Sequence, residues 1–194
     1  PIRVTGGTAI IMDGFDPHAV HKALQTSRIT HLMALPIQYQ QLLEVIDQGE
    51  AFHDVRMCIY AMAPLAERWI DRLMTAFPSA SVVLGSGMTE CVPATVFQWP
   101  EHRATKGGSW GPPTPTCEVA IISGDGTLAG AGETGEIVYR GPHVMHGYLN
   151  NAEANTAAFA HGWLHTGDIG HLDEDGVLWF TDRAKDIVKS GGEN

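Results

Sequence analysis

The sequence predicts an α/β fold: a mostly parallel sheet with crossover helices, followed by a small antiparallel β-rich unit resembling a barrel. Over the first hundred residues, short apolar strands alternate with amphipathic helical patterns, as in chains whose helices cross over between parallel strands. Beyond residue 105, glycine and proline recur every few residues, and short strand patterns lie beside turn signals. A composition of 44% hydrophobic and 18% charged residues supplies enough apolar side chains for a buried core.

The helices and strands of the first half follow from local patterns. Asp16 is a candidate N-cap, and Pro17 suits the first position of a helix. The third helix has one apolar face with a residue at every fourth position, namely Leu65, Trp69, Leu73 and Phe77. The predicted helices span 16–27, a segment that begins at Pro36, and 64–77, and the predicted strands span 29–35, 55–61 and 81–85.

The second half is predicted to contain strands at 117–122, 135–140 and 176–182 and one helix at 152–160. The glycine-rich stretch 124–135 contains Asp125 and Glu133 but no lysine, so we interpret it as a hairpin loop and not as a phosphate-binding loop. Because the pattern changes between the halves, we divide the chain into an α/β subdomain, 1–108, and a β-rich subdomain, 109–183.

Charge and cysteine content exclude several classes of protein. With 12 basic and 22 acidic residues, the net charge of -10 argues against binding of nucleic acid or an anionic membrane, but a few local cations can still hold a small anion. Three separated cysteines (Cys58, Cys91 and Cys117) indicate reduced thiols in a cytoplasmic protein. No apolar run reaches the roughly 18 residues of a membrane span, no signal peptide is expected, and both ends read as cut from a larger protein. No pattern supports a particular oligomeric state.

Several common catalytic motifs are absent from the sequence. It contains no GxxxxGK[ST], no GxGxxG between a strand and a helix, and no GxSxG elbow. Its ten histidines form no HExxH motif and no Cys/His cluster at zinc spacing. His161, His165 and His171 share a turn-rich region, where we expect surface or turn roles and not a metal site.

Two polar strings remain as candidate functional segments. The first, SGMTE at 86–90, follows a buried strand, and ligands of open parallel sheets bind beyond the carboxyl ends of strands. The Thr89 hydroxyl suits a phosphate oxygen, and the Glu90 carboxylate offers the hard oxygen that Mg²⁺ prefers. The alternative is an ordinary polar turn without a ligand.

The second string is GWLHTGD at 162–168, and it is followed by a predicted hairpin. Asp168 can accept two hydrogen bonds from a vicinal diol, and Arg183, at the end of the next strand, can point to the same place. Lys185 and Lys189 follow at a spacing of four. The alternative is a hairpin with a satisfied turn aspartate and solvated cations.

Together the two strings resemble the core signatures of the adenylate-forming superfamily, which includes acyl-CoA synthetases, luciferase-like ligases and peptide-synthetase adenylation domains. SGMTE is similar to its aromatic-Gly-Met-Thr-Glu motif, and GEIVYRGPHVMHGYLN, 135–150, to the stretch between the signatures. AMAPL, 61–65, occupies the place of GGAPL. GWLHTGD and KDIVKSGGEN resemble the segments of fatty- or aryl-acid CoA ligases. The resemblance implies ATP- and Mg²⁺-dependent activation of a fatty or aryl carboxylic acid and its transfer to CoA.

The resemblance also implies roles for single residues. Thr89 would contact the α-phosphate, and Glu90 would hold Mg²⁺. Asp168 and Arg183 would bind the ribose hydroxyls. Lys185 would be the hinge at the start of a C-terminal lid, 184–194, and Lys189 would lie near the phosphates or the pantetheine path. The set implied for nucleotide and CoA binding is completed by Ala63, Pro64, Ser86, Gly87, Met88, Gly191 and Gly192, and the set for the acyl substrate is Met62, Val92 and Pro93.

The chain departs from the superfamily pattern at two positions. Ser86 stands where an aromatic residue stacks on adenine, which predicts weaker or repacked adenine binding. Met62 replaces a glycine of GGAP, which predicts a narrowed or reshaped acyl site.

The superfamily's phosphate loop and its catalytic lysine lie outside this sequence, so the 194 residues alone are expected to be inactive. Two alternatives stay open: adenylation for a carrier protein, and a degenerate module that binds a nucleotide or partner without catalysis.

Overall fold

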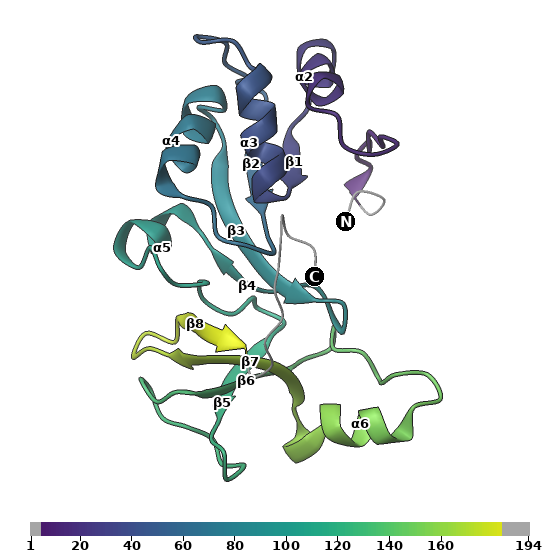
Figure 1. Ribbon diagram of the computed structural model, residues 1–194, viewed down its shortest axis with the longest axis vertical. Helices are drawn as coiled ribbons and strands as arrows, with labels where there is room; N and C mark the ends of the chain where they lie inside the picture. Colours follow the sequence, from purple (N-terminus) through teal and green to yellow (C-terminus); the bar gives the residue numbers. More distant parts are fainter. Residues whose placement is uncertain (1–4, 184–194) are drawn as a thin grey trace.

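The computed structural model describes residues 5–183 and contains two four-stranded sheets. The first sheet has the strand order β1-β2-β3-β4 and the second β5-β6-β7-β8, and they form the upper and lower halves of the molecule in Figure 1. The predicted α/β class, with a parallel-rich sheet followed by a separate antiparallel one, is confirmed. Within residues 5–183, no helix has the length and apolar character that crossing a bilayer requires.

The first sheet is parallel over three of its strands. β1 (His31–Ala34), β2 (Met57–Tyr60) and β3 (Ser81–Met88) pair in parallel, and β4 (Cys91–Gln98) runs antiparallel to β3. The sequence predicted β3 to end at residue 85 and did not predict β4. β3 continues through Ser86, Gly87 and Met88 because β4 folds back on it after a turn at residues 89–90.

Three helices pack with the first sheet, close to the predicted ranges. These are α2 (Pro17–Thr26), α3 (Pro36–Val45) and α4 (Glu67–Ala76). Asp16 caps α2 as predicted, since its carboxylate accepts the His18 N–H at 3.0 Å. The completely buried Tyr39 hydroxyl donates to carbonyls of Leu32 and Ile59, and this ties α3 to β1 and β2.

The apolar face of α4 differs from the prediction at one position. Leu65, Leu73 and Phe77 are buried as predicted, but Trp69 is only half-buried and Ile70 is buried beside them. The Arg72 guanidinium lies 5.0 Å from the centre of the Trp69 ring, so the half-buried indole makes a cation–π contact on the surface of the helix.

The second sheet is antiparallel throughout. Its strands are β5 (Glu118–Ile122), β6 (Gly135–Arg140), β7 (Leu164–Leu172) and β8 (Leu178–Arg183). The sequence did not predict β7, because its polar and glycine residues gave no strand pattern; pairing with β6 and β8 on either side makes it a strand. The predicted helix appears as α6 (Ala152–Ala158) and is followed by the 3₁₀ turn η1 (Ala160–Gly162).

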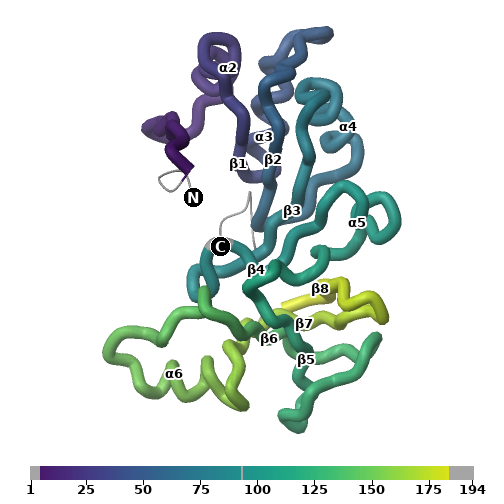
Figure 2. Tube along the Cα trace, turned by 180° about the vertical axis from the view of Figure 1, so that it is seen from behind, coloured from purple at the N-terminus to yellow at the C-terminus, as the bar shows by residue number. Residues whose placement is uncertain are grey.

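The two sheets meet along the segment that joins β4 to β5, and Figure 2 shows β4, the last strand of the first sheet, on the side that faces β6 to β8. Trp110 stacks on Phe180 with ring centres 4.5 Å apart. Gly111 pairs with Leu178, and its φ of +98° and the closeness of the Phe97 carbonyl leave no room for a side chain. Lys106, directly after α5 (Pro100–Thr105), forms ion pairs of 2.6 and 2.7 Å with Asp173 and Asp175 of the β7–β8 hairpin.

Lys106→Met removes the ion pairs that join the two sheets. Partial burial by itself would raise the pKa of Asp173, but hydrogen bonds from Lys106, the Trp179 indole and the backbone of Val177 and Asp175 lower it well below its ordinary value. A carboxyl with a depressed folded pKa stabilises the fold above its unfolded pKa, and this stabilisation is lost as the pH falls through the folded pKa. We therefore expect a lower urea midpoint than wild type at pH 7, with a difference that narrows as the pH falls below about 4.

The matched control is Arg28→Met, which removes the exposed ion pair with Asp54 at 3.6 Å and should leave the midpoint unchanged. Equal midpoints for wild type and Lys106→Met at pH 7 would contradict a stabilising role for the pair.

Candidate functional site

The first polar string spans the end of β3 and the turn into β4. Ser86, Gly87 and Met88 belong to β3, and Thr89 and Glu90 form the turn, at the carboxyl end of the parallel strands where ligands of such sheets bind. The Thr95 hydroxyl of β4 donates to the Ser86 carbonyl at 3.1 Å, which holds the string in place. The other substrate candidates of this region, Val92 and Pro93, lie in β4, and Val92 is exposed.

A tyrosine from the loop after β6 holds the Glu90 carboxylate. The Tyr148 hydroxyl donates to Glu90 Oε1 at 2.8 Å, and this hydrogen bond raises the pKa of the phenol. The Glu90 carbonyl accepts the Met145 N–H at 2.8 Å. Asn155 of α6 in turn fixes Tyr148, because its amide oxygen accepts the Tyr148 N–H at 2.6 Å and its amide nitrogen donates to the Tyr148 carbonyl at 2.9 Å. The proposed magnesium ligand is thus oriented by a contact that the sequence analysis did not identify.

The second polar string places an aspartate beside an arginine. Asp168 of β7 is directly opposite Arg183 of β8, and Arg183 Nε lies 2.7 Å from Asp168 Oδ1. The Asp168 side chain is only 13% exposed. A carboxylate has about four acceptor sites, so Asp168 can pair with Arg183 and still accept hydrogen bonds from a ligand hydroxyl.

Glu136 of β6 shapes the irregular turn within β7 that presents Asp168, at the point where the pairing of β6 with β7 shifts register. Its Oε1 accepts the Gly167 N–H at 2.8 Å, and its Oε2 lies 2.8 Å from His165 Nδ1. The Thr166 hydroxyl donates to the Ile137 carbonyl at 2.6 Å and accepts the Asp168 N–H at 3.0 Å. Gly167 has a φ of +72°, which glycine adopts without strain. His165 thus lies within β7, half-buried between the Glu136 carboxylate and the Ala160 carbonyl, and not in a surface turn as the sequence predicted.

Two buried hydroxyls link the first string to β6, the strand that pairs with the second string. Tyr139 of β6 is buried, and its hydroxyl is hydrogen-bonded to that of Thr95, which donates to the Ser86 carbonyl. Burial raises the pKa of Tyr139 well above its ordinary value, and the negative charge of Asp168 raises it further. The phenol therefore stays protonated at neutral pH, and Asp168 acts on it electrostatically.

The segment after β2 lies at the same end of the first sheet. β2 pairs with residues 81–84 of β3, so the residues that follow β2 run beside Ser86 and its neighbours. Ala63 is half-buried and Pro64 exposed. Met62 is 52% exposed and has a φ of +73°, in the left-handed region that favours glycine. The superfamily's glycine at this position is therefore replaced by a residue that is strained there. Lys185, Lys189, Gly191 and Gly192 lie outside the described residues.

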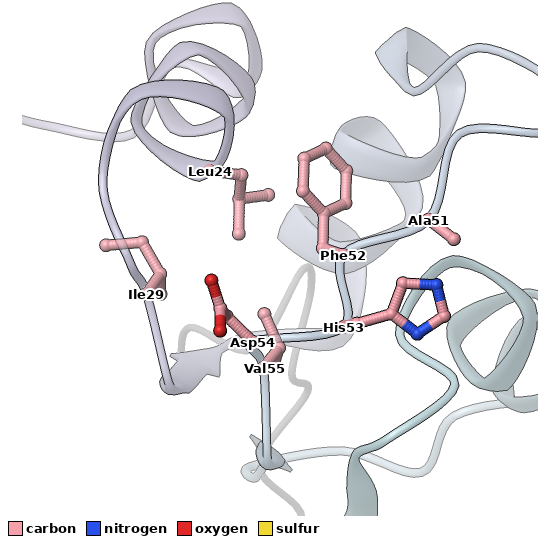
Figure 3. A pocket seen from close by; sticks show the side chains of 7 residues that line it. All are labelled: Leu24, Ile29, Ala51, Phe52, His53, Asp54 and Val55. Carbon is pink, nitrogen blue, oxygen red and sulfur yellow. The ribbon is translucent and has the colours of Figure 1, made fainter.

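Two surface pockets lie away from these strings. The first, of about 230 Å³, lies beneath α2, and Figure 3 shows Leu24 and Phe52 above it with Asp54 and Val55 at its base. Ile29 and Val55 precede β1 and β2, so this pocket lies at the amino ends of the strands. The second, of about 400 Å³, is lined by β4, Trp99 and residues 112–116. Neither pocket contains a residue of the two polar strings.

The structure also gathers Cys91, Cys117 and His143, whose candidate ligand atoms lie within 4.8 Å of one another. The sequence has no Cys/His cluster at zinc spacing, and these three residues come together only through the fold. Each of the three residues lies in a different segment, so no local spacing reveals them.

Comparison with known proteins shows that the chain is similar to AMP-binding enzymes. The family described as AMP-binding enzyme matches residues 2–149. Feruloyl-CoA synthase from Amycolatopsis sp is 36% identical over 199 aligned residues, which cover 100% of this chain and 39% of that protein. Indoleacetate–CoA ligase from Aromatoleum aromaticum is 33% identical over 195 residues, which cover 100% of this chain and 38% of that protein.

Solved structures agree with the sequence comparison. o-Succinylbenzoate coenzyme A synthetase from Bacillus subtilis, in complex with ATP and magnesium ion, superposes with a TM-score of 0.86 at 32% identity, covering 100% of this chain and 40% of that one. The chain thus spans about two fifths of the length of the curated relatives that it matches.

Glu136→Ala should destabilise the turn before Asp168. The substitution leaves the Gly167 N–H and the His165 ring without their carboxylate, and for a partly exposed group we expect a loss of about 1–2 kcal/mol in the free energy of unfolding, measured with urea. Glu174→Ala, in the exposed tip of the β7–β8 hairpin, is the control and should change stability by less than about 0.5 kcal/mol. Equal effects of the two substitutions would show that Glu136 does not hold the turn.

Proposed function

This chain belongs to the AMP-binding enzyme family, and from that membership we propose that the protein containing it activates an aryl carboxylic acid with ATP and transfers the acyl group to CoA. Similar proteins carry the names feruloyl-CoA synthase and indoleacetate–CoA ligase, which favours an aryl over a fatty acid among the two classes that the sequence allows. The observation that carries the proposal is that the buried hydroxyls of Thr95 and Tyr139 link the Ser86 string, next to Glu90, to β6, where the charge of Asp168, the partner of Arg183, acts on the Tyr139 phenol.

The side chains at the two strings suit a magnesium nucleotide. Glu90 offers carboxylate oxygens, the ligand type that Mg²⁺ prefers, and Tyr148 orients them. When bound, Mg²⁺ would neutralise charge on the phosphates. We assign the α-phosphate contact to Thr89, and the ribose hydroxyls to Asp168 with Arg183. Ala63, Pro64, Ser86, Gly87 and Met88 are assigned to the rest of the nucleoside.

The proposed reaction has two steps. In the first, a carboxylate oxygen of the acid bonds to the α-phosphorus of ATP while the bond to the bridging oxygen breaks, which gives an acyl-adenylate and pyrophosphate. In the second, the CoA sulfur bonds to the acyl carbon, AMP leaves and the thiol proton passes to solvent. Residues of this chain contribute mainly by positioning, because a nucleotide with its ribose and α-phosphate fixed presents the α-phosphorus in one orientation.

The region outside residues 5–183 is assigned by the family resemblance alone. In this proposal Lys185 is the hinge between the β-rich subdomain, 109–183, and a lid, and Lys189, Gly191 and Gly192 lie near the phosphates or the pantetheine of CoA. The α/β subdomain, 1–108, binds the phosphate end of the nucleotide through Glu90 and its magnesium ion.

Adenine binding is proposed to differ from that of relatives with an aromatic residue at position 86. Base stacking on an aromatic face contributes about 1–3 kcal/mol, and Ser86 has no ring. Its carbonyl is already held by Thr95, so adenine contacts at this position fall to the Ser86 hydroxyl and the neighbouring backbone.

The test of this proposal is exchange of labelled pyrophosphate into ATP by the full-length protein, with a panel of aryl, short-chain and long-chain acids. We expect exchange with aryl acids and thioester formation with free CoA. Asp168→Ala should lower kcat/KM for ATP by about 10- to 100-fold, because it removes charged hydrogen bonds to the ribose. Asp125→Ala, at the exposed β5–β6 loop, should leave the exchange unchanged.

Other results of this assay would replace the proposal. Exchange without CoA thioester formation would indicate adenylation for a carrier protein. No exchange with any acid, from a folded protein, would indicate a degenerate module that only binds a nucleotide or a partner.

Substitution of Met62 tests its proposed place at the acyl site, together with Val92 and Pro93. The left-handed conformation costs about 1–2 kcal/mol for a residue other than glycine, and the greater freedom of unfolded glycine offsets roughly 0.5–1 kcal/mol of this. Met62→Gly should therefore raise the free energy of unfolding by about 0.5–1 kcal/mol, whereas Met62→Ala keeps the strained backbone and gains nothing. Both variants should shift the preference toward bulkier acids.

The two readouts are independent of each other. An unchanged acid preference in both variants would remove Met62 from the acyl site. Equal stability of the glycine and alanine variants would show that the backbone at this position is not strained.

A further inference from the structure

Three potential metal ligands meet where the first sheet joins the second. Cys91 begins β4, Cys117 precedes β5, and His143 lies in the loop after β6. One ligand atom from each lies within 4.8 Å of the other two. Cys91 has no exposed surface, Cys117 is 7% exposed and His143 is half-buried. The cluster takes no part in the proposed acid activation.

The histidine of this cluster lacks hydrogen-bond partners. Both His143 ring nitrogens are buried, and neither has a partner among residues 5–183. A buried polar atom without a partner costs roughly 1–3 kcal/mol, so native proteins seldom retain one without another use for it. The unpartnered ring beside two thiols is therefore an independent sign of a ligand at this place.

The distances between the three ligand atoms are compatible with a small tetrahedral ion. Zinc bonds of about 2.3 Å to sulfur and 2.0–2.1 Å to nitrogen place tetrahedral ligand atoms roughly 3.5–3.8 Å apart. The observed spread of at most 4.8 Å therefore closes on an ion through small side-chain rotations. The backbone is already arranged for this closure, because Cys91 pairs with Val144 next to His143, and the Cys117 N–H bonds to the Thr114 carbonyl.

We propose that Cys91, Cys117 and His143 bind one Zn²⁺ ion, with a water molecule in the fourth position. Binding releases the two thiol protons to solvent, so two thiolates and one neutral imidazole surround the dication and the buried site carries no net charge. Cys₂His sets with one open position are established zinc donors, and thiolate sulfur excludes Mg²⁺ because that ion requires oxygen ligands.

Zinc at this place fixes the turn that carries Glu90. Cys91 follows Glu90 directly, and the loop with His143 also supplies the Met145 N–H that bonds to the Glu90 carbonyl. The ion therefore cross-links the start of β4 to two segments of the second sheet. Because it binds the folded state and not the unfolded one, it raises the thermal midpoint.

The experiment is a metal titration of the full-length protein after reduction and chelator treatment. Co²⁺ serves as the probe, since tetrahedral cobalt bound to thiolates absorbs in the near-ultraviolet and visible ranges. We expect one equivalent of cobalt per chain, displaced by one equivalent of Zn²⁺, and a higher thermal midpoint with zinc than with chelator.

Variants assign the site to its residues. Cys117→Ser and His143→Ala should each weaken zinc binding by more than roughly 100-fold, because even loss of an outer-shell partner costs 10–100-fold. Cys58→Ala is the matched control: it removes the other buried cysteine, in β2, and should leave cobalt and zinc binding unchanged.

A measurement on the wild-type protein keeps the test independent of whether the variants fold. X-ray absorption at the zinc edge should find two sulfur ligands at about 2.3 Å and one nitrogen at about 2.0–2.1 Å. An absence of thiolate-to-cobalt absorption in the reduced protein would overturn the proposal, as would equal binding by wild type and His143→Ala. A Cys91–Cys117 disulfide that forms in air, in a protein that binds no zinc once reduced, would also overturn it.

Discussion

Thr95 has no exposed surface, and its hydroxyl lies at the meeting point of the two sheets. A buried hydroxyl must find partners within the protein, and Thr95 finds them in the Ser86 carbonyl of the first sheet and in Tyr139 of the second. Thr95 and Ser86 both belong to the first sheet, so a shift of one sheet against the other would break the hydrogen bond between Thr95 and Tyr139. The sheets are thus held in one arrangement, and with them Glu90 and the Asp168–Arg183 pair.

The supporting contacts around these residues have a common pattern. Each candidate ligand group is held by a side chain from another strand or loop: Glu90 by Tyr148, and the Asp168 turn by Glu136. Apolar side chains form a buried core against each sheet. The orientation of the Glu90 and Asp168 side chains, by contrast, is set by hydrogen bonds between segments. This explains why the stretch 135–150 carries recognisable motif residues although we assign it no direct ligand contact: Glu136 and Tyr148 act through the residues they hold.

Most of the secondary structure could be predicted because its signals are local. The Asp16 cap, the apolar runs of β1 to β3 and the turns around β5 and β6 are visible within short windows. β4 was missed because Pro93 in the middle of CVPATVFQ argues against a central strand; the structure accommodates it because β4 is the last strand of its sheet. β7 was missed because its polar residues serve the site, and pairing on both sides outweighs its weak strand pattern.

The candidate site was predictable only in part, because only its local signals are visible in the sequence. Each polar string has a local signature, but the bond between Glu90 and Tyr148 joins residues 58 positions apart. The cluster of Cys91, Cys117 and His143 has no signature at all along the chain. Sequence patterns identify groups that meet a ligand, and the groups that orient them emerge only from the fold.

The position of β4 has a consequence for how the protein behaves at high concentration. An edge strand with free N–H and C=O groups is a template on which another chain can add a strand and begin aggregation. The outer side of β4 is already used at Cys91 by Val144 and at Val96 by Pro113, and Pro93 between them has no N–H to offer. At these positions the edge of the sheet has no free groups for strand addition by a second molecule, and the segments that join the two halves of the protein are the ones that cover it.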